Sequence, residues 1–250
     1  MYQNIYFDKI ENIDDYRDLI MNFHYAHRMP SVSFAYGLFY NDKLMGVVTY
    51  GQPASRTLQT GFFGKEHAHR VIELNRLYIK DEVSQTIPNI TSEFVAWSLK
   101  QLKPYNKAVV SFSDLGMNHS GGIYRATNFM YLGKTPARTD KFSGFGKHSR
   151  HYDKEAKEVL RVYRTQKMKY LYLAMDKTHK KQYMKLLKYP VLEYPKEKIF
   201  GQHYKPGDTE PVYYKDMKTG NKITEQEAKE ILKNEWGVNY GPKRDSRYTY

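Results

Sequence analysis

Residues 111–133 read SFSDLGMNHSGGIYRATNFMYLG, and this stretch decides the fold that the sequence predicts. It continues an apolar run, residues 108–112, that is typical of a buried strand. Asp114 stands where that strand ends, and Tyr124 stands about one turn into the helix that follows. Ligands of open α/β sheets bind at the carboxyl ends of strands. The spacing therefore predicts a site with an acidic residue and a tyrosine.

A glycine-containing turn joins this strand to this helix. The turn consists of Ser120, Gly121 and Gly122, and Asn128 and Gly133 end the short helix after it. Ser120 can cap the helix, and a glycine-rich turn brings backbone N–H groups close to a ligand. We expect these three residues to bind the cofactor or donor.

Both residues of the predicted site also have a purely structural interpretation. An Asp after a strand is commonly a turn residue or a helix cap. A Tyr on a short helix commonly packs half-buried against its neighbours. The spacing leaves open whether Asp114 and Tyr124 are catalytic or structural.

The preceding sequence alternates helical and strand patterns. A helix begins after Asn12 and ends near His24, before Pro30. A hairpin follows, and residues 52–70 form a polar loop. The remaining elements expected in this half are strands at residues 33–40, 44–50 and 71–79 and a helix at residues 90–102.

The strand at residues 71–79, VIELNRLYI, contains two charged residues in an apolar context. Glu73 and Arg76 are expected on opposite faces, because side chains alternate along a strand. A charge inside an apolar strand needs a partner or a ligand. We therefore include Arg76 among the candidate site residues.

The segment HYAHR at residues 24–28 is a dense polar cluster at the end of the first helix. His24 and His27 are three residues apart, so on a helix they could share a face and bind a metal such as iron. The alternative is a solvated helix end, where cationic side chains suit the negative end of the helix dipole. The spacing fixes no third ligand.

Composition excludes several classes of protein. The chain of 250 residues has no cysteine, which excludes a disulfide scaffold, thiolate zinc sites and a cysteine nucleophile. No apolar run reaches the roughly 18 residues of a membrane span. The polar N-terminal sequence does not resemble a signal peptide. These features lead us to expect a cytoplasmic protein with no membrane partner.

Positive charge is concentrated in the second half of the chain. Residues 1–133 carry 13 Lys and Arg against 12 Asp and Glu, whereas residues 134–250 carry 27 against 15. The 24 tyrosines add aromatic side chains that can stack on bases. This half is expected to bind a nucleic acid. A basic surface with no such role is the alternative.

After residue 133 the helical and strand patterns are weaker. We expect a basic loop at residues 134–152, a helix at 153–164, a strand at 170–175, and helices at 179–188 and about 225–236. The last of these begins with a Thr–Glu capping box. We predict a domain at residues 1–195 and a basic extension at residues 196–250.

The order of the predicted elements resembles the Gcn5-related N-acetyltransferase (GNAT) superfamily. The run GGIYRATNFMYLGK is similar to its fourth helix and following turn. This resemblance implies an α/β fold with a mixed, mostly antiparallel central sheet flanked by helices. Within it, the segments HYAHRMPSVSFAYGLFYNDKLMGVVTYGQPASR, ELNRLYI and SFSDLGMNHSGGIYRATNF resemble the Mom family of phage DNA-modification proteins, from about Phe23 to about Pro195.

The resemblance to the Mom family implies an activity. Members convert adenine in double-stranded DNA to N6-carbamoylmethyladenine, which shields phage DNA from restriction enzymes in the host cytoplasm. The residues that match the family's functional positions are His24, Tyr25, Arg76, Asp114 and Tyr124. One departure from the superfamily concerns the phosphate-binding turn, because KDEVSQTIPNITSEF after Ile79 has no glycine. This departure weighs against conventional acyl-CoA binding.

Adenine N6 is a poor nucleophile, so a base must remove its proton as it attacks. We assign Asp114 as that base, Tyr124 as a donor to the leaving group or oxyanion, and Arg76 as the residue that orients an anionic group. Tyr25 or Tyr50 could stack on an adenine that has left the duplex.

The identity of the donor stays open at this point. Candidates are an activated glycine such as glycyl-tRNA, acyl-CoA, and an iron-assisted route through His24 and His27. Two other functions compete with DNA modification. They are an acyl-CoA-dependent N-acetyltransferase that acts on an amine or protein, and a non-enzymatic DNA-binding protein.

Overall fold

The computed structural model describes residues 4–117, 119, 121–145, 159–195 and 212–236. Contacts divide the chain into two compact units. The first unit comprises residues 1–113, 121–133 and 168–199, and the second comprises residues 114–120, 134–167 and 200–250. Each unit is assembled from segments far apart in the sequence. The domain boundary that we place between residues 195 and 196 stays a prediction.

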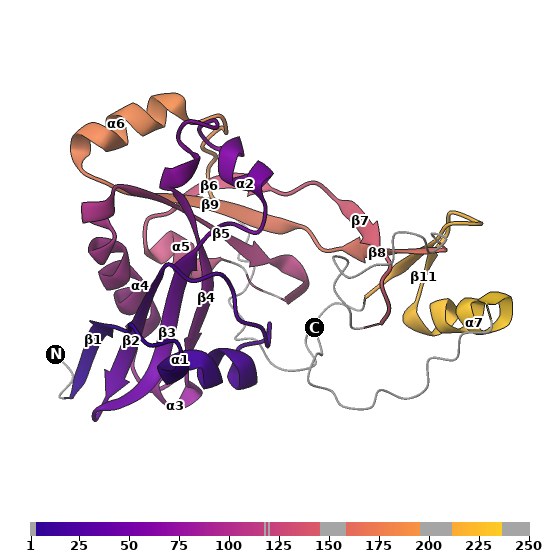
Figure 1. Ribbon diagram of the computed structural model, residues 1–250, viewed down its shortest axis with the longest axis horizontal. Coiled ribbons are helices and arrows are strands. Elements are labelled where there is room, and N and C mark those ends of the chain that lie inside the picture. The colour runs from indigo at the N-terminus through magenta and orange to yellow at the C-terminus, as the bar shows by residue number, and fades with distance from the viewer. Residues whose placement is uncertain (1–3, 118, 120, 146–158, 196–211, 237–250) are drawn as a thin grey trace. The chain divides into compact units, whose positions relative to one another are not determined.

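A seven-stranded sheet forms the centre of the first unit (Figure 1). Its strand order is β1-β2-β3-β4-β5-β9-β6. The pairs from β1 to β4 are antiparallel, and β4 and β5 are parallel. The strands are β1 (Ile5–Lys9), β2 (Phe34–Tyr40), β3 (Lys43–Gly51), β4 (Val71–Ile79), β5 (Lys107–Asp114), β6 (Met130–Lys134) and β9 (Lys167–Ala174).

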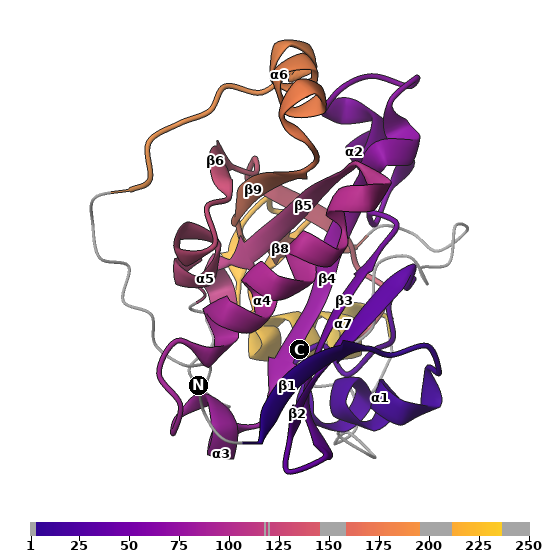
Figure 2. The ribbon, with the colours of Figure 1, turned by 90° about the vertical axis from the view of Figure 1, so that its left-hand side faces the viewer.

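Helices cover both faces of this sheet (Figure 2). Tyr16 and Ile20 pack against Ala35 and Val47 on one face. On the other face Trp97 packs against Tyr36. The helices of this unit are α1 (Asp14–Asp18), which continues as a π-helical turn at Leu19–Phe23, α2 (Arg56–Gly61), α3 (Asp81–Ser84), α4 (Ile90–Gln101), α5 (Gly122–Ala126) and α6 (Lys177–Leu186).

A β-bulge in β4 changes the direction of its side chains. Thr49 pairs with Arg76 and Gly51 pairs with Glu73, so Asn75 is an extra residue between the two pairs. Thr49 and Gly51 share a face because they are two residues apart, and paired residues share a face as well. The expectation that Glu73 and Arg76 face opposite sides is therefore wrong, because the bulge interrupts the alternation.

The parallel strands β4 and β5 separate partway along their length. Their pairing covers Val71–Glu73 with Ala108–Val110. At the next residue the Ser111 hydroxyl, and not a backbone group, donates to the Leu74 carbonyl at 3.0 Å. The carboxyl ends of both strands continue beyond this point. The backbones of β4 and β5 therefore no longer pair with each other where the predicted site residues lie.

A four-stranded sheet and one helix form the described core of the second unit. The strand order is β11-β10-β8-β7. The elements are β7 (Arg138–Lys141), β8 (Leu160–Arg164), β10 (Tyr214–Asp216), β11 (Lys222–Ile223) and α7 (Glu225–Trp236). Leu160 and Tyr214 pack against Ala228 and Leu232 of α7. The extension predicted at residues 196–250 thus contains the predicted helix and two strands that we did not predict.

Three other expectations need correction. Residues 160–164, expected within a helix, form β8, because Val162 and its neighbours pair with strands on both sides. The expected loop at residues 52–70 contains α2, and the expected loop at residues 134–152 contains β7. Part of the expected helix at residues 153–164 lies outside the described residues.

The fold class agrees with the prediction. The central sheet is mixed, its described pairs are mostly antiparallel, and helices flank it. The hairpin, the strand at residues 71–79 and the helix at residues 90–102 are confirmed with small shifts in their ends. In the described parts of the chain, every helix is too short or too polar to cross a membrane.

Candidate functional site

Arg76 is anchored where β4 leaves β5. Its Nε and Nη2 donate to the Arg28 carbonyl at 3.1 and 2.9 Å, and Nη1 donates to the Asn75 carbonyl at 2.6 Å. A guanidinium has five N–H donors, and these bonds use three of them. The other two have no acceptor among the described residues, so they can bind a ligand. Burial lowers the pKa of Arg76, and Tyr25 opposes that effect. The group remains a cation, fixed in direction and only partly exposed to water.

Tyr25 and His24 lie in the chain segment that follows α1. Their rings stack with centroids 4.3 Å apart. His24 is 5% exposed, and its Nδ1 accepts a hydrogen bond from the Ala26 backbone at 3.0 Å. Tyr25 is half-buried. His24 thus fixes the Tyr25 ring, and Tyr25 is close enough to Arg76 to influence its pKa.

Tyr124 of α5 is 8% exposed and points into the gap between β4 and β5. Ser111 Oγ lies 2.8 Å from the Tyr124 hydroxyl and 3.0 Å from the Leu74 carbonyl. A serine hydroxyl has one proton, so both bonds form together only if Tyr124 donates to Ser111. Burial raises the pKa of Tyr124 well above its usual value, with smaller contributions from Tyr25 and Glu73. Tyr124 therefore stays protonated at neutral pH.

Glu73 belongs to this group of residues, although we did not include it among the candidates. The bulge places it on the same face as Arg76, and it acts on the pKa of both Arg76 and Tyr124. One carboxylate oxygen accepts from the Ala54 backbone at 3.2 Å. Its paired residue, Gly51, has no side chain, and a Cβ there would lie 1.7 Å from the Ser31 carbonyl. The only sequence signal for Glu73 is a charge within an apolar strand.

Asp114 ends β5 and belongs to the second unit. One of its oxygens accepts from Thr165 Oγ1 at 2.6 Å and from the Gly116 backbone at 3.1 Å, and the other lies 3.0 Å from Lys167 Nζ. The backbone N–H of His119 also donates to the Asp114 carbonyl, and burial lowers the pKa of that histidine. These contacts hold the carboxylate in one orientation, as both the catalytic and the structural interpretation require.

The turn before α5 is determined partly by packing. Gly121 has a φ of +74°, and a Cβ there would lie 1.9 Å from the Tyr170 hydroxyl. No other residue type fits this position without displacing Tyr170. Gly122 is the first residue of α5, and Ser120 lies outside the described residues. Donor binding by these three residues stays a prediction.

The geometry of the two candidate metal ligands differs from the helical pair that we expected. The helix ends at Phe23, so His24 and His27 do not share a helical face. His27 has a φ of +41°, and its Nδ1 lies 2.9 Å from the Met21 carbonyl. Among the described residues there is no group of three or more His, Asp or Glu side chains that could hold a metal ion.

Two further expectations concern ligands. Tyr50 is fully buried and bonds Ser98 at 2.6 Å, so it cannot stack on an adenine and that suggestion is wrong. The glycine-free segment after Ile79 is partly helical. The N–H groups of Val83, Ser84 and Gln85 bond carbonyls of the same segment. These donors are therefore occupied and do not form a phosphate-binding turn.

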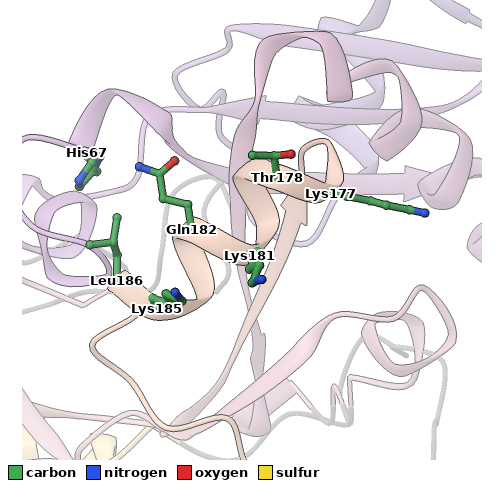
Figure 3. A pocket seen from close by; sticks show the side chains of 7 residues that line it. All are labelled: His67, Lys177, Thr178, Lys181, Gln182, Lys185 and Leu186. Atoms are coloured by element: carbon green, nitrogen blue, oxygen red, sulfur yellow. The ribbon is translucent and has the colours of Figure 1, made fainter.

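A separate concave surface lies beside α6 (Figure 3). It has a volume of about 740 Å³ and contains none of the predicted site residues. Three of its residues are lysines on successive turns of α6, which suits an anion. The lining residues are His67, Lys177, Thr178, Lys181, Gln182, Lys185 and Leu186.

The strand order, with a parallel pair that separates beside an anchored arginine and a buried tyrosine, defines an α/β protein of the GNAT type. The sequence profile of the Mom protein family matches residues 4–196, and the chain belongs to this family. Among curated relatives, the methylcarbamoylase Mom of Escherichia phage Mu is 26% identical over 121 residues. That match covers 47% of this chain and 49% of the relative, so the chain spans about half the length of the relative.

Solved structures with partial similarity are acetyltransferases. One is an N-acetyltransferase from Staphylococcus aureus Mu50, which is 12% identical to this chain and has a TM-score of 0.42. The aligned region covers 68% of this chain and 97% of that acetyltransferase. A ribosomal-protein-S5-alanine acetyltransferase from Vibrio fischeri is 9% identical, with 70% and 95% coverage and a TM-score of 0.42. Superpositions at this level are partial, so the fold assignment rests on the strand order.

Proposed function

We propose that this protein is a phage-type transferase that converts adenine in double-stranded DNA to N6-carbamoylmethyladenine and so protects the DNA from restriction enzymes. The family match over residues 4–196 is the observation that carries the proposal. The name of the phage Mu relative, methylcarbamoylase, indicates the same group. The reaction would take place in the cytoplasm of the bacterial host.

Arg76, Tyr25 and Tyr124 would form the binding part of the site. The two N–H groups of Arg76 that have no acceptor among the described residues can hold an anionic part of the donor. Tyr25, half-buried and fixed by His24, can stack on an extruded adenine. Tyr124 is protonated at any physiological pH because of its raised pKa, so it can stabilise a developing oxyanion when its hydroxyl turns from Ser111 to that oxygen.

Asp114 is the proposed general base for the N6 proton. Its two oxygens are oriented by Thr165 and Lys167, which leaves the carboxylate fixed and only part-buried. Glu73 is the second candidate, because it lies on the same face as Arg76 and close to Tyr124. Substitution of each carboxylate by its amide distinguishes the two roles.

We propose an activated glycine as the donor, with glycyl-tRNA as the leading candidate. N6 would attack the glycyl carbonyl, the N6 proton would pass to the base, and the tRNA hydroxyl would leave. The glycyl amine could then attack C6, and cleavage of the original C6–N bond would give the isomeric carbamoylmethyl group. Every atom of the glycyl unit is retained in these steps.

Two other donors are less well supported by the geometry. For acyl-CoA, the N–H groups of Val83, Ser84 and Gln85 after Ile79 are already bonded within their own segment. For iron, the described residues offer no group of three ligands around His24 and His27. An acyl-CoA-dependent N-acetyltransferase is the second candidate function, because the central sheet has the GNAT strand order.

The test is nucleoside mass spectrometry of DNA from cells that express the protein. We expect a fraction of deoxyadenosine to gain the mass of one glycyl unit. Cells that express Asp114→Asn at an equal soluble level serve as the control and should contain unmodified deoxyadenosine. Unmodified DNA from cells with soluble wild-type protein, together with acetyl transfer from acetyl-CoA to an amine, would favour the acetyltransferase instead.

A further inference from the structure

Four basic residues are paired in one row across the sheet of the second unit. Lys141 of β7 pairs with Arg161 of β8, and Arg161 pairs with Lys215 of β10. Lys215 in turn pairs with Lys222 of β11. Residues paired across a ladder share a face. The row therefore places four cationic side chains side by side, at steps of about 4.8 Å.

The opposite face of this sheet is the apolar one. Leu160 and Tyr214 alternate with the basic residues along β8 and β10, and they pack against Ala228 and Leu232 of α7. Side chains of adjacent residues in a strand point to opposite faces. The basic row thus lies on the face opposite α7, and the hydrophobic core of this unit does not need it.

Two tyrosines flank the row on its own face. Tyr163 lies two residues after Arg161, and the Tyr163 backbone N–H donates to the Tyr213 carbonyl at 2.9 Å. Lys222 Nζ is 4.0 Å from the centre of the Tyr213 ring and 5.7 Å from that of Tyr163. These cation–π contacts hold one ammonium at the end of the row. Because Lys222 covers the Tyr213 ring, stacking of unpaired bases on that ring is disfavoured.

Like charges placed directly opposite each other destabilise a β-ladder. Arg161 donates from Nε and Nη2 to Thr139 at 2.8 and 2.9 Å, so part of its guanidinium is already bonded within the sheet. Lys215 and Lys222 are paired directly with each other, so this end of the row opposes two like charges. A polyanion bound along the row would remove the repulsion. Lys215 and Lys222 lie outside residues 4–196, the part of the chain that matches the family.

We propose that this basic row binds the phosphate backbone of double-stranded DNA. A duplex presents its phosphates outward, at about one negative charge per 1.7 Å of helix axis, and its bases are stacked inside. This matches a face with a line of cations and with one tyrosine ring already covered. The choice of DNA rests on the proposed function, but the surface is tested by binding alone.

The test compares two double variants of the full-length protein. Lys215→Gln with Lys222→Gln removes two charges from the row. Lys229→Gln with Lys233→Gln removes two charges from α7, which packs on the opposite face. Affinity for a fluorescent DNA duplex is measured at several salt concentrations. We expect the row variant to lose affinity and its salt slope to become shallower by about 0.9 for each phosphate that is no longer neutralised.

Stability provides a second readout of the row. The single variant Lys215→Gln should melt at or above the temperature of the wild type, because it removes one of two opposed like charges and keeps the contact of Lys222 with Tyr213. Lys215→Glu should also fold, because the new carboxylate lies between Arg161 and Lys222. We expect this variant to bind duplex DNA more weakly than Lys215→Gln.

Three results would overturn the inference. The first is equal affinity loss in the row variant and the α7 variant, and the second is no loss in either. The third is a loss for tRNA with unchanged affinity for duplex DNA. Modification of adenine, measured in parallel, separates this inference from the proposed function. Unmodified DNA together with row-dependent binding refutes the function alone, and modification together with row-independent binding refutes the surface alone.

Discussion

Glu73 and Arg76 lie on the same face of β4 because the bulge at Asn75 inserts one unpaired residue between them. Bulges are common next to active sites, where they redirect a side chain. Here the bulge places a carboxylate and a guanidinium on the same face, and Glu73 raises the pKa of both Arg76 and Tyr124. The direction of Arg76 in the proposed site therefore depends on a single inserted residue.

The bulge can be tested through its side-chain hydrogen bonds. Thr49 Oγ1 donates to Asn75 Oδ1 at 2.6 Å, and Asn75 Nδ2 donates to the Ser31 carbonyl at 2.8 Å. Asn75→Ala leaves the fully buried Thr49 hydroxyl without this partner, so we expect a loss of about 1–3 kcal/mol in the free energy of unfolding. Denaturant unfolding measures this loss.

The double variant Thr49→Val with Asn75→Ala is the control. Removal of both partners should recover part of the lost stability, because no buried hydroxyl is then unsatisfied. DNA modification should fall in both variants, because both remove the Asn75 side chain that bonds the bulge to Thr49 and Ser31, and the bulge sets the direction of Arg76. Full activity in Asn75→Ala would show that the bulge is irrelevant to catalysis.

The two candidate bases give opposite predictions. Asp114→Asn keeps the shape of the side chain and removes its basicity, so we expect modification to fall by about 10²–10⁴-fold. Glu73→Gln should reduce modification less, because it removes charge near Arg76 but not the base. Quantitative mass spectrometry of modified deoxyadenosine measures both variants. Near-normal modification by Asp114→Asn together with loss in Glu73→Gln would assign the base to Glu73.

Tyr124→Phe separates chemistry from packing. The ring remains stacked on Tyr170, with centroids 4.5 Å apart, and only the hydroxyl bonded to Ser111 is lost. We expect a stability loss of about 1 kcal/mol and a much larger fall in turnover. Tyr170→Phe is the matched control, because its hydroxyl bonds Ser113 in the same stack. If the two variants reduce turnover equally, the Tyr124 hydroxyl has no catalytic role and Tyr124 only packs against its neighbours.

Buried tyrosines predict a loss of stability at high pH. Burial raises the pKa of Tyr36 to about 12, and it also raises the pKa of Tyr50 and Tyr124. A group with a raised pKa in the folded state stabilises the fold fully below its unfolded pKa of about 10, and this stabilisation is lost as pH rises. The thermal midpoint should therefore fall between about pH 10 and 12, in step with the absorbance of tyrosinate. A constant midpoint over this range would contradict the prediction.

Much of the fold follows from local sequence signals. The strand at residues 71–79 has a continuous apolar pattern, and its bounds agree with the prediction. The capping box before α7 forms as expected, with Thr224 N–H donating to Glu227 at 2.7 Å. Such elements are predictable because their pattern depends on residues only a few positions apart.

Pairing between strands that are distant in the sequence determined the features that local signals did not predict. Residues 160–164 form a strand because β7 and β10 lie on either side, and β10 is some 50 positions further along the chain. No local pattern indicates the bulge at Asn75, because a bulge is defined by the register with a neighbouring strand. The basic row likewise exists only through the pairing of four strands.

The sequence alone therefore predicted the family and the fold class correctly and proposed four candidate site residues of the first unit, because each rests on residue identity or local spacing. The tertiary structure decided which of their side chains share a face. It added Glu73 to the candidate site, excluded Tyr50 as a stacking residue, and showed that Thr165 and Lys167 orient Asp114. The physical reason is that facing, burial and partners are set by contacts between strands far apart in the chain.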